Sequence, residues 1–231
     1  MFLAECTTEE FLDFIELSFK VNHPPEGGFG STAVIEALNE IFRIGGMPYY
    51  LTDYVKVEED ESGSVFPGGR TSGYQVIRTV AYPKIIVVEE EMAYEEAVRP
   101  ALAILGHPHF AVANTELRDG LEHYREGRYK ECLTSCGSAL ESVLKVICDR
   151  KRWDYSHTDT LGDLLDSVVP KLDLPQVFSE KFKLVATIRN TFSASHGGGK
   201  APRDPARHLA QYMVTTTAAT IVFLVATAEG R

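Results

Sequence analysis

From residue 108 to the end of the chain, apolar residues recur with the spacing of helices, and no segment shows the alternation of a strand. Glycine, proline and capping residues separate the periodic segments. Five helices in about 120 residues favour an all-α bundle with short connections. The predicted helices are Asn114–Glu126, Tyr129–Cys148, Leu161–Val169 capped by Thr160, Pro175–Ser195, and a last helix that opens with Asp204 as N-cap and Pro205 at the first position and ends at Ala228.

Residues 1–107 have a different pattern and predict a small α+β domain. Two amphipathic helices come first, one opened by a Thr7–Glu10 capping box and one by Ser31 or Thr32 and closed by Gly45–Gly46. The break at Gly106 to Pro108 sets the expected boundary between domains 1–107 and 108–231. The other expected elements are strands Tyr49–Val57 and Tyr74–Val80, a mobile loop at 58–70 between them, Ile85–Val88 as a third strand or the lead into a helix, and a helix Glu89–Leu105.

Acidic residues are concentrated in the first part of the chain. Residues 1–107 carry 7 Lys and Arg against 18 Asp and Glu, a net charge of −11, whereas residues 108–231 carry 16 against 15, a net charge of +1. Neither part is a basic platform for nucleic acid, so any contact with RNA is expected to be local and within residues 108–231. The acidic part repels a polyanion, and it is interpreted as a sensor, an autoinhibitor or a docking surface.

The sequence gives no reason to expect a membrane anchor, a metal or a cofactor. Met1–Asp13 has no basic leader, and the apolar tract Tyr212–Ala228 is short and rich in Thr, so a cytoplasmic chain is expected. Cys132 and Cys136 lie one helical turn apart and could hold half of a metal site, but no matching Cys/His pair occurs elsewhere, and buried packing is the preferred interpretation.

The most distinctive stretch joins an Arg-Asn pair, Arg189 and Asn190, to His196, which is followed by three glycines. In a continuous helix, seven positions are about two turns, which places Arg189 and His196 on one face roughly 10 Å apart. The run Gly197–Gly199 is read as a helix stop, because a P-loop would need other spacing and an esterase would need a G-x-S-x-G motif. The plainer alternative is that Arg189 forms a surface ion pair and His196 caps the helix C-terminus.

An arginine and a histidine without a metal suit the cleavage of RNA by its own 2′-OH. A histidine can remove the 2′-OH proton or protonate the 5′-oxygen, an arginine stabilises the charge that builds on the phosphate, and the Asn190 amide can hold either group. General acid–base cleavage needs a group on each side of the phosphate. The wide spacing within one helix therefore favours a two-fold dimer that brings together two copies of the stretch.

The Arg189-Asn190…His196-Gly197 spacing resembles the signature of the abortive-infection C-terminal family within the HEPN superfamily of helical RNases. Leu121–Cys132 is similar to the first helical hairpin of these domains, Ala139–Lys145 to an alanine-x-glutamate-x-x-x-lysine segment, and Ile221–Val225 to the closing helix. In the N-terminal part, the segments Phe14–Phe19 and Leu38–Phe42, together with Pro48-Tyr49-Tyr50, resemble the region joined to such domains in AbiJ-type phage-defence proteins.

The resemblance implies a metal-independent endoribonuclease that acts as a homodimer in abortive infection or toxin–antitoxin defence, with RNA as substrate and a regulatory or antitoxin protein as a further partner. It implies Arg189, Asn190 and His196 as the catalytic set. Glu141 and Lys145 match supporting positions, or form an ion pair one helical turn apart on the surface. The alternative is a catalytically inactive HEPN-type module that binds a nucleotide or a protein, or serves in dimerisation.

Overall fold

The computed structural model describes residues 6–21, 32–64, 71–88, 93–192 and 204–230, with backbone only at 58–64 and 71–77. The chain divides into two compact units, one made of residues 1–47 and 51–85 and the other of residues 48–50 and 86–231. The fold is mainly α: a C-terminal helical bundle follows a small α+β region, as predicted. Residues 86–107 belong to the helical unit, whereas the sequence grouped them with the N-terminal part.

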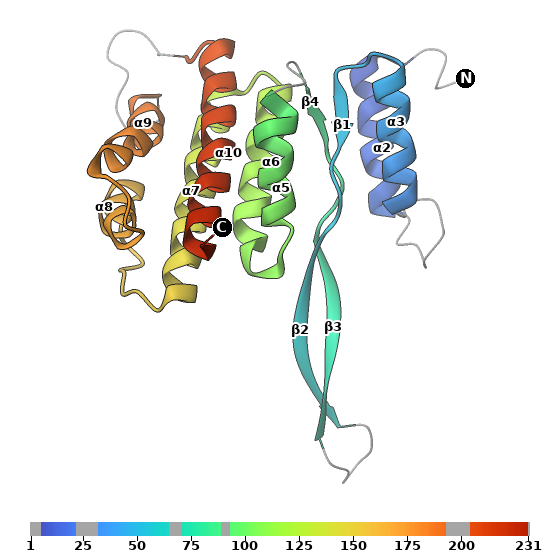
Figure 1. The fold of residues 1–231 in the computed structure, drawn as a ribbon. Coiled ribbons are helices and arrows are strands. Elements are labelled where there is room, and N and C mark those ends of the chain that lie inside the picture. Colours follow the sequence, from blue (N-terminus) through green and yellow to red (C-terminus); the bar gives the residue numbers. More distant parts are fainter. Residues whose placement is uncertain (1–5, 22–31, 65–70, 89–92, 193–203, 231) are drawn as a thin grey trace. The chain divides into compact units, whose positions relative to one another are not determined.

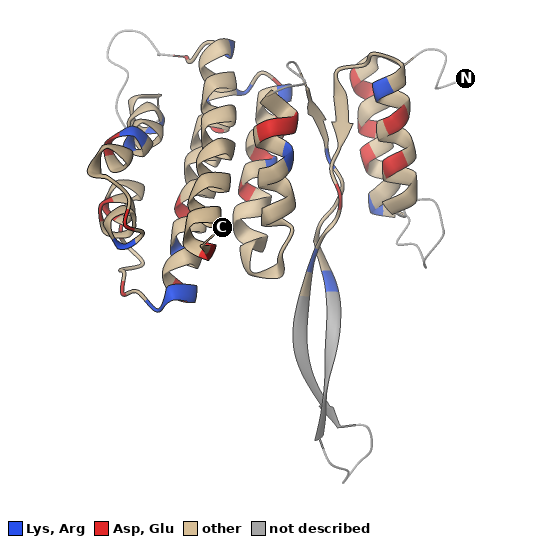
Figure 2. Ribbon diagram, in the orientation of Figure 1, with Lys and Arg blue, Asp and Glu red and all other residues tan. Residues whose placement is uncertain are grey.

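In the first unit, the helices α2 (Thr8–Val21) and α3 (Thr32–Ile44) present apolar faces to the core and polar groups to the strand backbone. The predicted capping box opens α2: the Glu10 amide donates to Thr7 Oγ1, and the Thr7 amide donates to the Glu10 carboxylate. The buried Glu16 carboxylate accepts the amide of Ile85 at 2.7 Å. Figure 2 shows acidic positions, in red, along the ribbon of both helices.

The strands form two separate two-stranded sheets. β1 (Tyr49–Leu51) pairs with β4 (Ile85–Val87), so the strand interpretation of the latter segment is confirmed. β2 (Val55–Ser64) pairs antiparallel with β3 (Thr71–Ala81), from Val55 opposite Ala81 to Ser64 opposite Thr71. The prediction of a loop from residue 58 was therefore wrong, because the backbone ladder continues through the acidic segment; residues 65–70 lie outside the described part.

The helical unit contains the five helices that the sequence predicted after residue 108. Figure 1 shows α7 and α10 lying against each other at the centre, with α5 and α6 on one side and α8 and α9 on the other, which agrees with the contacts between the helices. Apolar residues from all of these helices form one continuous core. The bounds are η1 (Tyr94–Val98), α5 (Arg99–Leu105), η2 (Pro108–Phe110), α6 (Ala111–Arg125), α7 (Tyr129–Lys151), α8 (Leu161–Lys171), α9 (Gln176–Phe192) and α10 (Arg207–Glu229).

The ends of the helices follow local chemistry. Thr160 and Asp163 form a complete capping box at the start of α8, as predicted for Thr160. α10 starts at Arg207, two residues after the predicted Pro205, and its N-cap Ala206 makes no side-chain bond. Asp204 instead lies 3.7 Å from Lys130 as an ion pair. The segment before α5 is a wider π-helical turn, where Pro100 has no N–H to donate to the preceding turn.

Within the described residues, α10 is a helix whose length and composition would allow it to cross a membrane, and half of its apolar window is buried inside the protein. Its buried residues include Met213, Ile221 and Leu224, which belong to the bundle core. The helix is therefore accounted for as the central core helix of the bundle.

Candidate active site

Arg189 lies near the C-terminal end of α9, in its last described turn. Val185 is fully buried one turn before it, and Ile188 and Phe192 are partly buried against the core on either side of it. These apolar neighbours fix the rotation of the helix, so that Arg189 exposes only 20% of its side chain. The arginine is thus held against the protein and does not project freely into solvent.

The Arg189 side chain crosses α7 at Gly137. A Cβ atom built on Gly137 would lie 2.5 Å from Arg189 Cδ and 3.4 Å from both Cγ and Nε. Real Cβ atoms do not approach other heavy atoms as closely as 2.5 Å, so the arginine fills the space that a side chain at this position would need. Arg189 can therefore pack here only because residue 137 is glycine.

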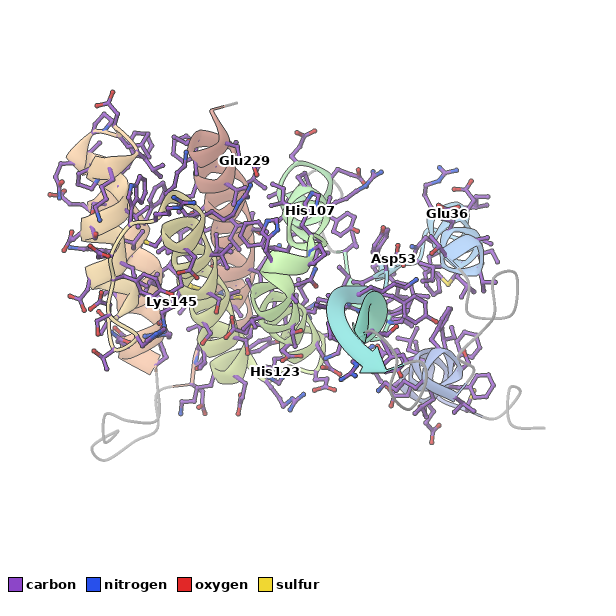
Figure 3. All side chains as sticks on the ribbon, turned by 90° about the horizontal axis from the view of Figure 1, so that it is seen from below. Glu36, Asp53, His107, His123, Lys145 and Glu229 are labelled. Atoms are coloured by element: carbon purple, nitrogen blue, oxygen red, sulfur yellow. The ribbon has the colours of Figure 1, made fainter. Side chains whose placement is uncertain are left out.

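Glu141 joins the arginine to a second cation. Its Oε2 lies 3.5 Å from Arg189 Nη1, and its Oε1 lies 2.8 Å from Lys145 Nζ. Of the two resemblance positions, Glu141 therefore lies beside Arg189, and it forms the expected ion pair with Lys145 one turn further along α7 (Figure 3 labels Lys145). The three charged side chains are between one fifth and about one quarter exposed, so solvent screens them less than an exposed pair.

Asn190 follows directly and is exposed, and its Oδ1 accepts a long bond of 3.4 Å from Arg189 Nε. The amide therefore contacts the arginine as well as solvent. His196 and Gly197–Gly199 lie outside the described residues, so the two-turn stacking of Arg189 and His196 stays a prediction.

Glu116 on α6 is an acidic residue of this region that the sequence reasoning missed. Its Oε2 is buried and has no hydrogen-bond partner among the described residues. Burial raises the pKa of the Glu116 carboxyl; the hydrogen bond from Ser142 opposes this, and the charge of Glu141 adds to it. The burial of Glu116 becomes apparent only when α6 packs against α7, because nothing in the α6 sequence distinguishes Glu116 from other helical glutamates.

We expect Glu116→Gln to stabilise the protein at neutral pH. A raised pKa means that the folded state binds the proton more tightly, so the stabilising contribution of Glu116 is fully present below its unfolded pKa of about 4.3 and is lost as pH rises through the folded pKa. A glutamine stays neutral and removes this loss. Thermal unfolding should show a higher Tm for the variant at pH 8, and a gain that shrinks toward pH 4.

The control for this prediction is Glu180→Gln, which changes an exposed glutamate on α9. Its effect on Tm should be small and should not grow from pH 4 to pH 8. If the Tm of Glu116→Gln at pH 8 is equal to or lower than that of the wild type, the buried carboxyl does not destabilise the folded protein at this pH.

The cysteines of the bundle are buried packing residues. Cys132, Cys136 and Cys148 are buried free thiols, and the hydrogen bond that the Cys136 thiol shares with Cys132, together with burial, raises the pKa of Cys136 well above its usual range. A thiol must ionise to bind a metal, so this environment disfavours one. In the described part of the chain, no three His, Cys, Asp or Glu side chains come together as a metal site.

Arg189 of α9 and Glu141 of α7 thus lie together on the surface of a five-helix bundle. The Abi_C family model, described as a HEPN-like domain, matches residues 111–228, from α6 to α10. The chain belongs to this family. Comparisons with curated proteins and with solved structures gave no match.

Proposed function

We propose that the chain is a metal-independent endoribonuclease whose catalytic residues are Arg189, Asn190 and His196. The observation that supports this most is the position of Arg189 within the domain matched by the family model: the guanidinium is fixed against α7, and Asn190 follows it. A HEPN-like domain of the Abi_C family is consistent with an RNase-type HEPN protein of abortive infection.

The proposed reaction is the transfer of a phosphodiester to the neighbouring 2′-oxygen. His196 accepts the 2′-OH proton, the 2′-oxygen bonds to phosphorus, and the bond from phosphorus to the 5′-oxygen breaks. A second histidine gives its proton to the departing 5′-oxygen, so the products are a 2′,3′-cyclic phosphate and a 5′-hydroxyl. Arg189 donates two hydrogen bonds to the phosphate oxygens as their charge increases, and the Asn190 amide holds the 2′-OH or the phosphate.

The second histidine is proposed to come from a second copy of the chain. In a continuous helix, the seven residues from Arg189 to His196 span roughly 10 Å, and one chain offers a single His in this motif. A two-fold homodimer that brings the two motifs together supplies the acid and the base in one composite site.

The biological role proposed is abortive infection or toxin–antitoxin antiphage defence in the cytoplasm, of the AbiJ type. In this role, RNA cleavage halts growth, and a regulatory or antitoxin protein restrains it. The region 1–107, with its net charge of −11, is the proposed sensor or docking surface for such a protein.

We expect the purified protein to cut single-stranded RNA in the presence of EDTA, and His196→Ala to reduce cleavage by about 10²- to 10⁴-fold, the usual contribution of a general acid or base. Gel analysis of labelled RNA measures this. Intact RNA with the wild-type chain would leave the catalytically inactive nucleotide- or protein-binding dimerisation module as the function. Equal cutting by the variant would exclude His196 as the catalytic acid or base.

A further inference from the structure

A lone glycine lies inside α7, which together with α10 is one of the two longest regular helices described in the helical unit. Gly137 is the ninth residue of α7, which runs from Tyr129 to Lys151 without interruption. Glycine in a helix interior destabilises the helix relative to alanine. No turn or positive φ requires glycine here, since the residue is helical and buried. The close approach of another group is the remaining reason for it.

That group is the aliphatic part of Arg189. The nearest three atoms to a Cβ on Gly137 all belong to this arginine, at 2.5 Å for Cδ and 3.4 Å for Cγ and Nε. The clash falls in the middle of the side chain and not at its end. Alanine at 137 therefore forces a different rotamer on Arg189, which moves the guanidinium as a whole.

Glu141 lies one turn beyond Gly137 on the same face of α7, and Lys145 lies one turn beyond Glu141. The stem of Arg189 rests on the first position of this row, and its Nη1 faces the second, 3.5 Å from Glu141 Oε2. Lys145 is closer to the carboxylate, at 2.8 Å. Glu141 is thus shared between two cations, so it orients the arginine without fully neutralising it.

We propose that Gly137 and Glu141 are positioning residues that form a cradle for Arg189. Gly137 admits the stem, and Glu141 sets the direction of the guanidinium. A preorganised arginine stabilises a developing phosphate charge without reorganising during the reaction, which is the largest single contribution in many enzymes. The identity of that phosphate as RNA rests on the proposed function, whereas the cradle itself rests on the packing of α7 and α9.

The test measures the change in Tm caused by Gly137→Ala in the wild-type protein and in the Arg189→Ala variant, with full-length protein throughout. With Arg189 present, the alanine should lower Tm or leave it unchanged, because the new methyl and the arginine compete for one space. With Arg189→Ala, the space is empty and the higher helix propensity of alanine should raise Tm by about 2–4 °C. Equal changes in Tm in both backgrounds would overturn the cradle.

A matched control is Gly162→Ala in α8, where the nearest atom to a new Cβ is Thr160 Oγ1 at an ordinary 3.6 Å. Its change in Tm should be the same with and without Arg189. This control separates the specific competition at Gly137 from a general effect of glycine replacement.

RNA cleavage provides the second readout. Gly137→Ala and Glu141→Gln should each lower kcat at least tenfold in the wild-type background and have no further effect in Arg189→Ala, because both act through that arginine. Additive losses would show that they act independently. If wild-type protein cuts no RNA but the Tm difference is present, the cradle stands and the proposed nuclease function fails.

Discussion

Replacing Arg189 by Ala is expected to slow RNA cleavage about 10²- to 10³-fold, the usual effect of removing one preorganised donor to an oxyanion. The Arg189 guanidinium extends from α9 and contacts Glu141 on α7, and water cannot replace its paired hydrogen bonds to a phosphate. Arg189→Lys keeps the charge but not the fork of donors, so it should recover only a small part of the rate. Single-turnover cleavage of a labelled RNA measures all three proteins.

The matched control is Lys181→Ala, which removes an exposed cation from the same helix. Its cleavage rate should stay within about twofold of wild type, because exposed charges contribute little and are screened by salt. A loss as large as that of Arg189→Ala would mean that the arginine acts through general electrostatic attraction of RNA and not through a fixed contact.

A dimer with one defective subunit is expected to lose nearly all activity. Two tags allow purification of a heterodimer with one wild-type chain and one His196→Ala chain. If both histidines serve one phosphate, this heterodimer lacks either the acid or the base, and its rate should fall about 10²-fold or more below the wild-type dimer.

Two independent active sites, one in each chain, would give the heterodimer a different cleavage rate. A heterodimer with one complete site per wild-type chain would retain about half of the activity. A wild-type pair with the same two tags controls for the purification. If the heterodimer retains half of the wild-type rate, a composite site is excluded, and each chain has a complete active site of its own.

Local sequence chemistry predicted much of the fold. The Thr7–Glu10 and Thr160–Asp163 capping boxes mark helix starts because the bonds lie within four residues of chain. The helical spacing of apolar residues predicted α6 to α10, since one face of each helix must enter the core. The prediction of Asp204 as N-cap was wrong, because α10 begins at Arg207 with Ala206 as its N-cap, and the Asp204 carboxylate lies beside Lys130.

The surroundings of Arg189 could not be predicted in the same way. The contact between Gly137 and Arg189 joins residues 52 positions apart, and it depends on how α9 lies across α7. The isolated glycine in a predicted long helix was the signal that could have found it. No such signal marks Glu116 or Ser142, whose environment arises only when α6 packs against α7.

The most direct test of the account is the chemistry of the cut RNA ends. Purified wild-type protein is incubated in EDTA with two RNAs of one sequence, of which the second carries a single 2′-deoxy nucleotide at the mapped cleavage position. The first RNA is expected to give 2′,3′-cyclic phosphate and 5′-hydroxyl ends, and the second no cut at the modified position, because the 2′-oxygen is the proposed nucleophile. Cleavage at the 2′-deoxy position, or an intact first RNA, would contradict it.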